Sequence, residues 1–264
     1  METQKLNELY ISLLIGLVLT LNACSTSPMG RRQLLLFPES KMSEMGAASF
    51  TQLKSTTPTI KDPTTYGYIK CITDRLLISM NEDPKAWQIE VFKDDRANAF
   101  ALPGKKMGIH TGMINLAKNQ DQIAAVIGHE IGHVIAKHSN ERMSQGTLAQ
   151  TGLQVSSLVL GSDSKTDGLI VGALGLGVQY GVMLPFSRSH ETEADRMGQM
   201  YMAKAGFDPA QAAELWKLMG KGRSKTPEFL STHPSPESRI VDLSSRAKKY
   251  QADYLASNKT ECKK

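Results

Sequence analysis

Residues 126–138 read Val-Ile-Gly-His-Glu-Ile-Gly-His-Val-Ile-Ala-Lys-His, and they contain the motif His129-Glu130-x-x-His133. If this segment is a helix, the two histidines lie one turn apart on one face, so both imidazoles can reach a single ion. Glu130 lies between them, close enough to take a proton from a metal-bound water without being a ligand. The spacing predicts a zinc site with a position left open for water.

The residues around the motif favour a helix over 121–142. Asn119 followed by Gln122 forms a plausible N-cap with its capping-box partner. The alternative is a core helix whose histidines only satisfy hydrogen bonds. Apolar residues recur at helical spacing through the segment, at Ile123, Val126, Ile127, Ile131, Val134 and Ile135.

A catalytic zinc usually has three protein ligands, and residues 187–198 supply a candidate. Glu191 and Asp195 are four residues apart and share one helix face, whereas Glu193 points elsewhere. We expect Glu191 to be the third ligand and Asp195 to orient a ligating histidine through its free ring N–H. The alternative is a solvated, charged helix start.

Four sequence motifs together resemble a known peptidase family. They are Asn-Ala-Phe-Ala-Leu-Pro-Gly at 98–104, Gly-His-Glu-Ile-Gly-His-Val at 128–134, Arg-Ser-His-Glu-Thr-Glu-Ala-Asp-Arg-Met-Gly at 188–198 and Thr-His-Pro-Ser-Pro-Glu-Ser-Arg-Ile at 232–240. This combination is similar to the gluzincin zinc metallopeptidases of the HtpX and CAAX-prenyl-protease type. Within that family the chain most resembles the soluble periplasmic lipoprotein branch.

The resemblance implies one zinc ion per chain, held by His129, His133 and Glu191, with Glu130 as general base. It also implies that His233 approaches the fourth position of the metal. There His233 would either hold the enzyme latent or polarise the substrate.

The remaining histidines are assigned other roles. His138 lies about 140° around the helix from His133, so we interpret it as structural rather than as a ligand of the same ion. His110 is expected in a strand, and His190 is expected to pack or to support the site. Arg239 is expected to stabilise the oxyanion or to pin a carboxylate, with an ordinary surface arginine as the alternative.

The first residues resemble a secretory address. An apolar stretch at 9–21 precedes Leu-Asn-Ala-Cys at 21–24, which is similar to a bacterial lipobox. We expect residues 1–23 to be a signal peptide, Cys24 to carry lipid and residues 24–38 to be an extended tether. The resemblance to lipoproteins implies a periplasmic location, anchored at the outer membrane. An uncleaved N-terminal anchor is the alternative.

The charge and cysteine content restrict the partners. A formal net charge of +5 without an interleaved basic and aromatic stripe does not indicate nucleic acid. The two other cysteines, Cys71 and Cys262, could pair in an oxidising compartment, and sequence alone does not decide whether they do.

Residues 39–264 are predicted to form a single metallopeptidase domain of the α+β class, mostly helical, with a small β-sheet beside the H-E-x-x-H helix. We expect the strand at 98–100 to line the cleft and pair with extended substrate. The Gly-rich region 145–186 is interpreted as a helical hairpin over the cleft. Helices are expected at 39–54, 64–80, 209–220 and from 236, and strands at 87–92, 97–102 and 107–111.

The function we expect is zinc-dependent endoproteolysis in the bacterial envelope, with unfolded or misassembled envelope proteins as substrates. That biology comes from the resemblance alone. No helical-repeat extension is recognised before Lys264, so we do not expect partner docking through such repeats. The rival hypotheses are a zinc-containing assembly factor or chaperone with latent or no proteolysis, and a membrane-surface module that uses the Gly-rich hairpin.

Overall fold

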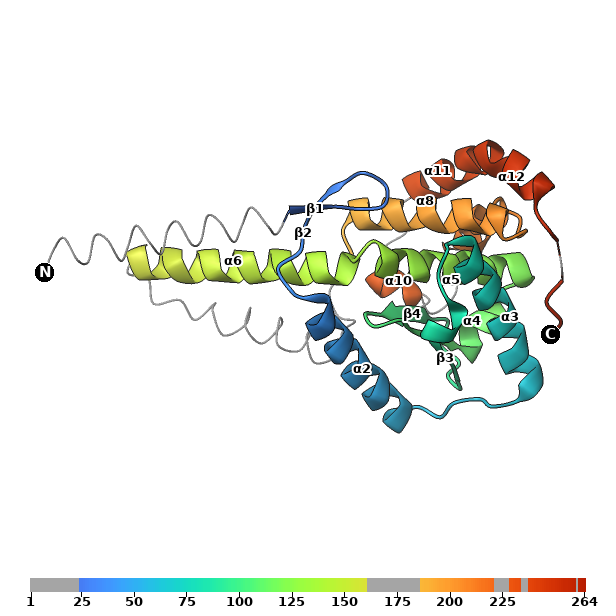
Figure 1. Cartoon of the computed structure of the whole chain (residues 1–264), viewed down its shortest axis with the longest axis horizontal. Helices are drawn as coiled ribbons and strands as arrows, with labels where there is room; N and C mark the ends of the chain where they lie inside the picture. The colour runs from blue at the N-terminus through green and yellow to red at the C-terminus, as the bar shows by residue number, and fades with distance from the viewer. Residues whose placement is uncertain (1–23, 161–185, 221–227, 234–236, 260) are drawn as a thin grey trace, which may run out of the picture.

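Two helices that carry the predicted ligands, α5 (Gln120–Ile135) and α8 (Arg188–Lys204), lie side by side at the centre of the molecule (Figure 1). The computed structural model describes residues 24–160, 186–220, 228–233, 237–259 and 261–264. The remaining helices and a small sheet surround this pair. The predicted class, mostly helical α+β, is confirmed.

Helix α5 begins as the sequence predicts. The Asn119 side chain caps the helix by accepting a hydrogen bond from Gln122 N at 2.9 Å, and Gln122 Oε1 accepts one from Lys118 N at 2.9 Å. The expected continuation to residue 142 is wrong. The helix ends at Ile135 because Lys137 is left-handed, with φ 54°, which breaks the i to i−4 hydrogen-bond pattern.

Helices α5 and α8 approach closely because glycines face each other where they cross. A Cβ atom added at Gly198 would lie 2.9 Å from Gly128 C and 2.9 Å from His129 N. Only a residue without a side chain allows the two backbones this close. The contact therefore sets the distance between the histidines on α5 and the carboxylates on α8.

The sheet lies against α5 and has the order β3-β5-β4. Strand β3 (Gln88–Phe92) runs parallel to β5 (Lys106–His110), while β4 (Ala99–Leu102) pairs antiparallel with β5. The turn between β4 and β5 uses Gly104 at φ 78°, a conformation that glycine adopts freely. Among the described strands β4 pairs with β5 alone, so no described strand covers its other edge, from which Ala101 N donates to Glu130 of α5.

The hydrophobic core fills the space between the sheet, α5 and the helices around them. Helix α3 (Pro63–Ser79) starts at Asp62, whose side chain accepts from Thr65 N, and places Ile69, Ile72 and Leu76 in this core. The short α4 (Thr111–Leu116) and α9 (Gln211–Gly220) complete it.

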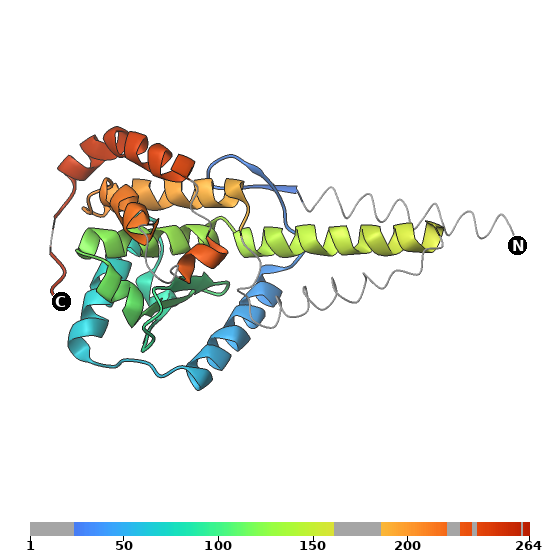
Figure 2. The ribbon, with the colours of Figure 1, turned by 180° about the vertical axis from the view of Figure 1, so that it is seen from behind.

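The C-terminal elements wrap around α8 and α9 (Figure 2). They comprise α11 (Glu237–Ala247), the 3-10 turn η2 (Lys248–Tyr250) and α12 (Gln251–Ala256). The short α10 (Phe229–Thr232) lies instead beside the sheet, where Phe229 N donates to Ala97 O. A disulfide joins Cys71 on α3 to Cys262, so the C-terminal tail is covalently fixed to the core.

The N-terminal residues differ from the expected extended tether. Strands β1 (Cys24–Thr26) and β2 (Arg32–Leu34) pair antiparallel as a two-stranded ribbon, and α2 (Glu39–Thr56) follows. The ribbon contacts the start of α6 (His138–Leu160) because buried polar side chains hold it there. Hydrophobic periodicity cannot predict the docking of this ribbon, because only one or two polar residues in a short segment hold it in place.

Helix α6 extends away from the rest of the domain (Figures 1 and 2). The second arm of the hairpin expected over 145–186 lies outside the described residues, as do the signal segment 1–23 and the start of the helix expected from residue 236. Within the described parts of the chain, no helix is both long and apolar enough to cross a membrane.

We predict that Gly198→Ala destabilises the protein by about 1–3 kcal/mol, because the new methyl group forces two backbones apart. The control is Gly67→Ala on α3, where an added Cβ meets nothing within 4 Å. That change should stabilise by about 0.5–1 kcal/mol. Urea unfolding monitored by circular dichroism measures both, and equal stability of the two variants would contradict the proposed close crossing.

Candidate metal centre

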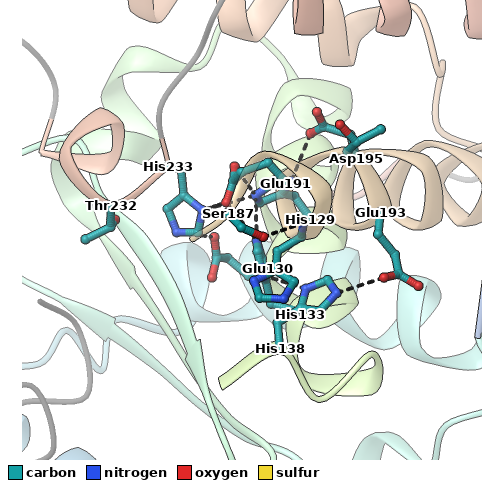
Figure 3. A network of polar contacts seen from close by, with 12 residues as sticks. His129, Glu130, His133, His138, Ser187, Glu191, Glu193, Asp195, Thr232 and His233 are labelled. Carbon is teal, nitrogen blue, oxygen red and sulfur yellow. Dashed lines mark hydrogen bonds and ion pairs between the residues drawn. The ribbon is translucent and has the colours of Figure 1, made fainter. Parts of the chain in front are cut away.

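Four buried side chains from three segments converge on one point (Figure 3). His129 and His133 come from α5, Glu191 from α8, and His233 directly follows α10. One donor atom from each lies within 4.8 Å of all the others. The structure thus brings together the three predicted ligands and the residue expected near the fourth position.

The distances between donor atoms suit a small tetrahedral ion. His129 Nε2 lies 3.0 Å from His133 Nε2, 3.5 Å from Glu191 Oε2 and 3.2 Å from His233 Nδ1. Glu191 Oε1 lies 3.4 Å from His133 Nε2 and 3.0 Å from His233 Nδ1. Ligand bonds of about 2.0–2.2 Å in a tetrahedron separate the donors by about 3.3–3.6 Å. These residues therefore fit a metal ion.

The electrostatics of the donors agree with this assignment. Burial lowers the pKa of His133 well below its ordinary value, which keeps its imidazole neutral. Burial opposes the charge on His129, but hydrogen bonds to Asp195 and Glu191 outweigh it and raise the pKa of His129 to about 9. Burial likewise opposes ionisation of Glu191, and its contacts with the histidines overcome this and lower its pKa. A cation is favoured at this point.

A second layer of side chains holds the donors in place. Asp195 Oδ1 lies 2.9 Å from His129 Nδ1, as expected for a carboxylate that fixes the tautomer of a ligating histidine. Arg239 donates to Asp195 from Nε at 2.7 Å and from Nη2 at 2.8 Å, and its Nη1 lies 2.6 Å from Glu191 Oε2. Of the roles left open for Arg239, the contacts agree with the one in which it holds carboxylates, here those of Asp195 and Glu191.

His138 has a closer relation to the site than the sequence indicated. Its Nδ1 lies 2.9 Å from Nδ1 of His133, one of the four converging donors, and its Nε2 lies 3.1 Å from Glu193 Oε2. It is not one of the four converging donors, as predicted. The sequence argument assumed an unbroken helix, whereas the turn at Lys137 brings the His138 ring back towards His133.

The other histidines lie apart from the converging donors. His190 stacks on His138 with ring centroids 4.5 Å apart. His110 lies in β5, as expected, with its Nδ1 3.7 Å from Asp94. Phe186 was missed by the sequence argument, yet its ring centroid lies 4.0 Å from that of His133. No sequence motif predicts that an aromatic ring such as Phe186 packs against His133.

Glu130 lies between the donors and β4. Its Oε2 accepts a hydrogen bond from Ala101 N at 3.1 Å, and its Oε1 lies 3.3 Å from His233 Nε2. Burial raises its pKa above the ordinary value. A cavity opens here, lined among others by Asn98, Ala99, Phe100, Glu130, Arg142, Phe186 and His233. Glu130 therefore meets both the donor cluster and the edge of the sheet.

Comparison with known proteins agrees with this geometry. The model of peptidase family M48 matches residues 63–247. That span contains α3, the sheet, α5, α8 and α11, together with the four converging donors. The chain belongs to peptidase family M48.

Characterised relatives carry related names. The chain is 37% identical over 182 residues to the mitochondrial metalloendopeptidase OMA1 of Schizosaccharomyces pombe, which covers 67% of this chain and 51% of that protein. It is 33% identical over 213 residues to the beta-barrel assembly-enhancing protease of Escherichia coli, covering 77% of this chain and 43% of that protein. It is 33% identical over 218 residues to the putative beta-barrel assembly-enhancing protease of Vibrio cholerae, an alignment that covers 80% of this chain and 45% of that protein. The chain thus spans about half the length of these relatives.

We predict that Asp195→Asn weakens metal binding by about 10- to 100-fold, because the amide holds neither the tautomer of His129 nor Arg239 as the carboxylate does. Competition with a chromogenic chelator measures the affinity. Asp242→Asn on α11 is the matched control, since Asp242 pairs with Arg246 at the surface. Unchanged affinity in Asp195→Asn would show that the contact with His129 does not support the ligand.

Proposed function

We propose that this chain is a zinc-dependent endopeptidase of the bacterial cell envelope. The observation that carries the proposal is the buried set of three ligands with Glu130 beside them, facing a cavity along the edge of a β-sheet. Membership of peptidase family M48 supports the reaction class. Two imidazoles, which are neutral when they bind a metal, and one carboxylate form a ligand set typical of catalytic zinc.

His129, His133 and Glu191 would hold the zinc. When bound, zinc polarises the scissile carbonyl and lowers the pKa of a coordinated water to about 7. Glu130 accepts the proton of the attacking water at its carboxylate and passes it to the leaving amine. The raised pKa of Glu130, caused by burial, moves this carboxylate towards the range in which it can both accept and return a proton.

The free edge of β4 is the proposed place for the substrate chain. The Ala101 N–H points away from β5 and towards Glu130, so the backbone groups of Ala99, two residues earlier, face the same side. An extended peptide can hydrogen-bond to this edge and lie across the cavity beside Glu130. This is the role expected for the strand at residues 98–100.

His233 holds a place that the reaction needs. Its Nδ1 lies 3.2 Å from His129 Nε2 and 3.0 Å from Glu191 Oε1, within the donor cluster itself. In this position the ring competes with water for the open coordination position. We therefore propose that this arrangement corresponds to a latent state, and that His233 withdraws before cleavage.

Several observations support an envelope location. The disulfide between Cys71 and Cys262 is typical of proteins outside the reducing cytosol. Cys24, the proposed lipid attachment site, is the first residue of the β1 strand, so the anchor would lie directly beside the folded domain. The bacterial relatives are named for assembly of β-barrels. Unfolded or misassembled envelope proteins are accordingly the proposed substrates, and the outer membrane is the proposed place of anchoring.

The test is degradation of casein by residues 25–264, in the wild type and in Glu130→Gln. We predict that Glu130→Gln binds zinc as the wild type does and loses at least about 100-fold in rate, because the base is absent. Glu44→Gln on the exposed surface of α2 is the control and should cleave normally. Near-normal cleavage by Glu130→Gln at equal zinc content would refute the assigned base.

The same assay examines the latent state. Cleavage that appears or increases in His233→Ala supports withdrawal of this ring as the activating step. Zinc binding without cleavage in any variant would instead favour the rival function, an assembly factor that retains zinc.

A further inference from the structure

A line of buried polar contacts leads away from the ligand His133 towards the N-terminus of the chain. The first contact joins His133 Nδ1 to His138 Nδ1 at 2.9 Å, and the second joins His138 Nε2 to Glu193 Oε2 at 3.1 Å (Figure 3). His138 is fully buried, and the Glu193 side chain is 4% exposed. These contacts lie on the side of His133 that does not face the other donors.

Coordination of a metal by His133 would fix the direction of both hydrogen bonds between His133, His138 and Glu193. His133 presents Nε2 to the donor cluster, so its single ring hydrogen is on Nδ1. That N–H donates to Nδ1 of His138, which must therefore carry its own hydrogen on Nε2. The His138 N–H then donates to Glu193. Through these two contacts Glu193 orients His138, and His138 in turn orients His133.

Arg31 holds the carboxylate at the end of this line. Its Nε donates to Glu193 Oε2 at 2.9 Å, while Nη1 and Nη2 each donate to one oxygen of Glu141 at 2.6 Å. One guanidinium therefore pairs with two buried carboxylates, Glu141 from α6 and Glu193 from α8.

The N-terminal ribbon holds Arg31 in this place. Ser27 Oγ accepts a hydrogen bond from Arg31 N at 3.0 Å. The buried Gln33 side chain donates to Ala136 O, just after α5, at 2.5 Å and to Glu141 Oε2 at 3.1 Å. The ribbon is thereby fixed at the C-terminal end of the helix that carries both histidine ligands.

We propose that Arg31 is a positioning residue for the metal ligand His133, acting through Glu193 and His138, so that docking of the N-terminal ribbon completes the metal site. The inference deepens the proposed function and rests on His133 being a ligand there. It assigns to residues 24–34 a part in metal binding, although the family match begins only at residue 63.

The test measures the zinc affinity of the full-length chain by competition with a chromogenic chelator. Arg31→Gln and His138→Phe should each weaken binding by about tenfold, the lower limit for groups behind a ligand. The double variant should be no weaker than His138→Phe, because Arg31 acts only through that ring. The control is Arg32→Gln, because Arg32 is the neighbouring residue, lies exposed at the start of β2 and should leave zinc binding normal.

A merely structural role for Arg31 gives a different result. In that case the losses of zinc affinity in the two single variants would multiply in the double variant, or Arg31→Gln would bind zinc as tightly as the wild type. Either outcome overturns the proposal. If Arg31→Gln does not fold, Glu193→Gln takes its place in the same cycle with the same expectation. Failure of the proposed function looks different, since the wild type itself would then bind no zinc or Glu130→Gln would still cleave casein.

Discussion

The close contact between Gly128 on α5 and Gly198 on α8 is the constraint on which the site depends. A side chain at Gly198 would place its Cβ atom 2.9 Å from the backbone of α5 and would push apart the helices that carry His129 and Glu191. Their donor atoms now lie 3.5 Å apart, within the range for ligands of one ion. The packing of these two backbones thus determines whether the donor atoms of α5 and α8 can bind one ion. Neither helix carries enough donors to form the site alone.

The second requirement is charge. The centre of the molecule buries several carboxylates, which is unfavourable unless each meets a cation or hydrogen-bond donors. Arg239 forms ion pairs with Asp195 and Glu191, and Arg31 forms one with Glu193. Each arginine comes from a segment far from the ligands in sequence. Arg31 precedes this helix pair in the sequence and Arg239 follows it, so segments from both sides are held against the same two helices.

The sequence supported a large part of this account. Spacing alone indicated the helical pair of histidines, the choice of Glu191 over Glu193 and the place of Asp195, because three- and four-residue periodicity survives folding. The break at Lys137 was not predicted, since no glycine or proline marks it. The contact of His138 with His133 depends on that break. The ribbon at 24–34 was missed because its docking rests on Arg31 and Gln33, two polar residues whose partners lie more than a hundred positions away.

The proposed latent arrangement would connect the structure of the site with its regulation. His233 follows a helix of only four residues, α10, whose Phe229 N donates to Ala97 O beside the edge strand. A ring carried on so short an element can leave the donor cluster without disturbing α5 or α8. Its withdrawal would open the coordination position and the cavity along β4 together, since His233 borders both.

The most direct test of the central claim is anomalous X-ray diffraction at the zinc edge from crystals of the purified protein. The account predicts one ion bonded to His129 Nε2, His133 Nε2 and a Glu191 oxygen at about 2.0–2.2 Å, with His233 Nδ1 beside it. An ion held by other residues, or no ion between α5 and α8 in protein saturated with zinc, would contradict it.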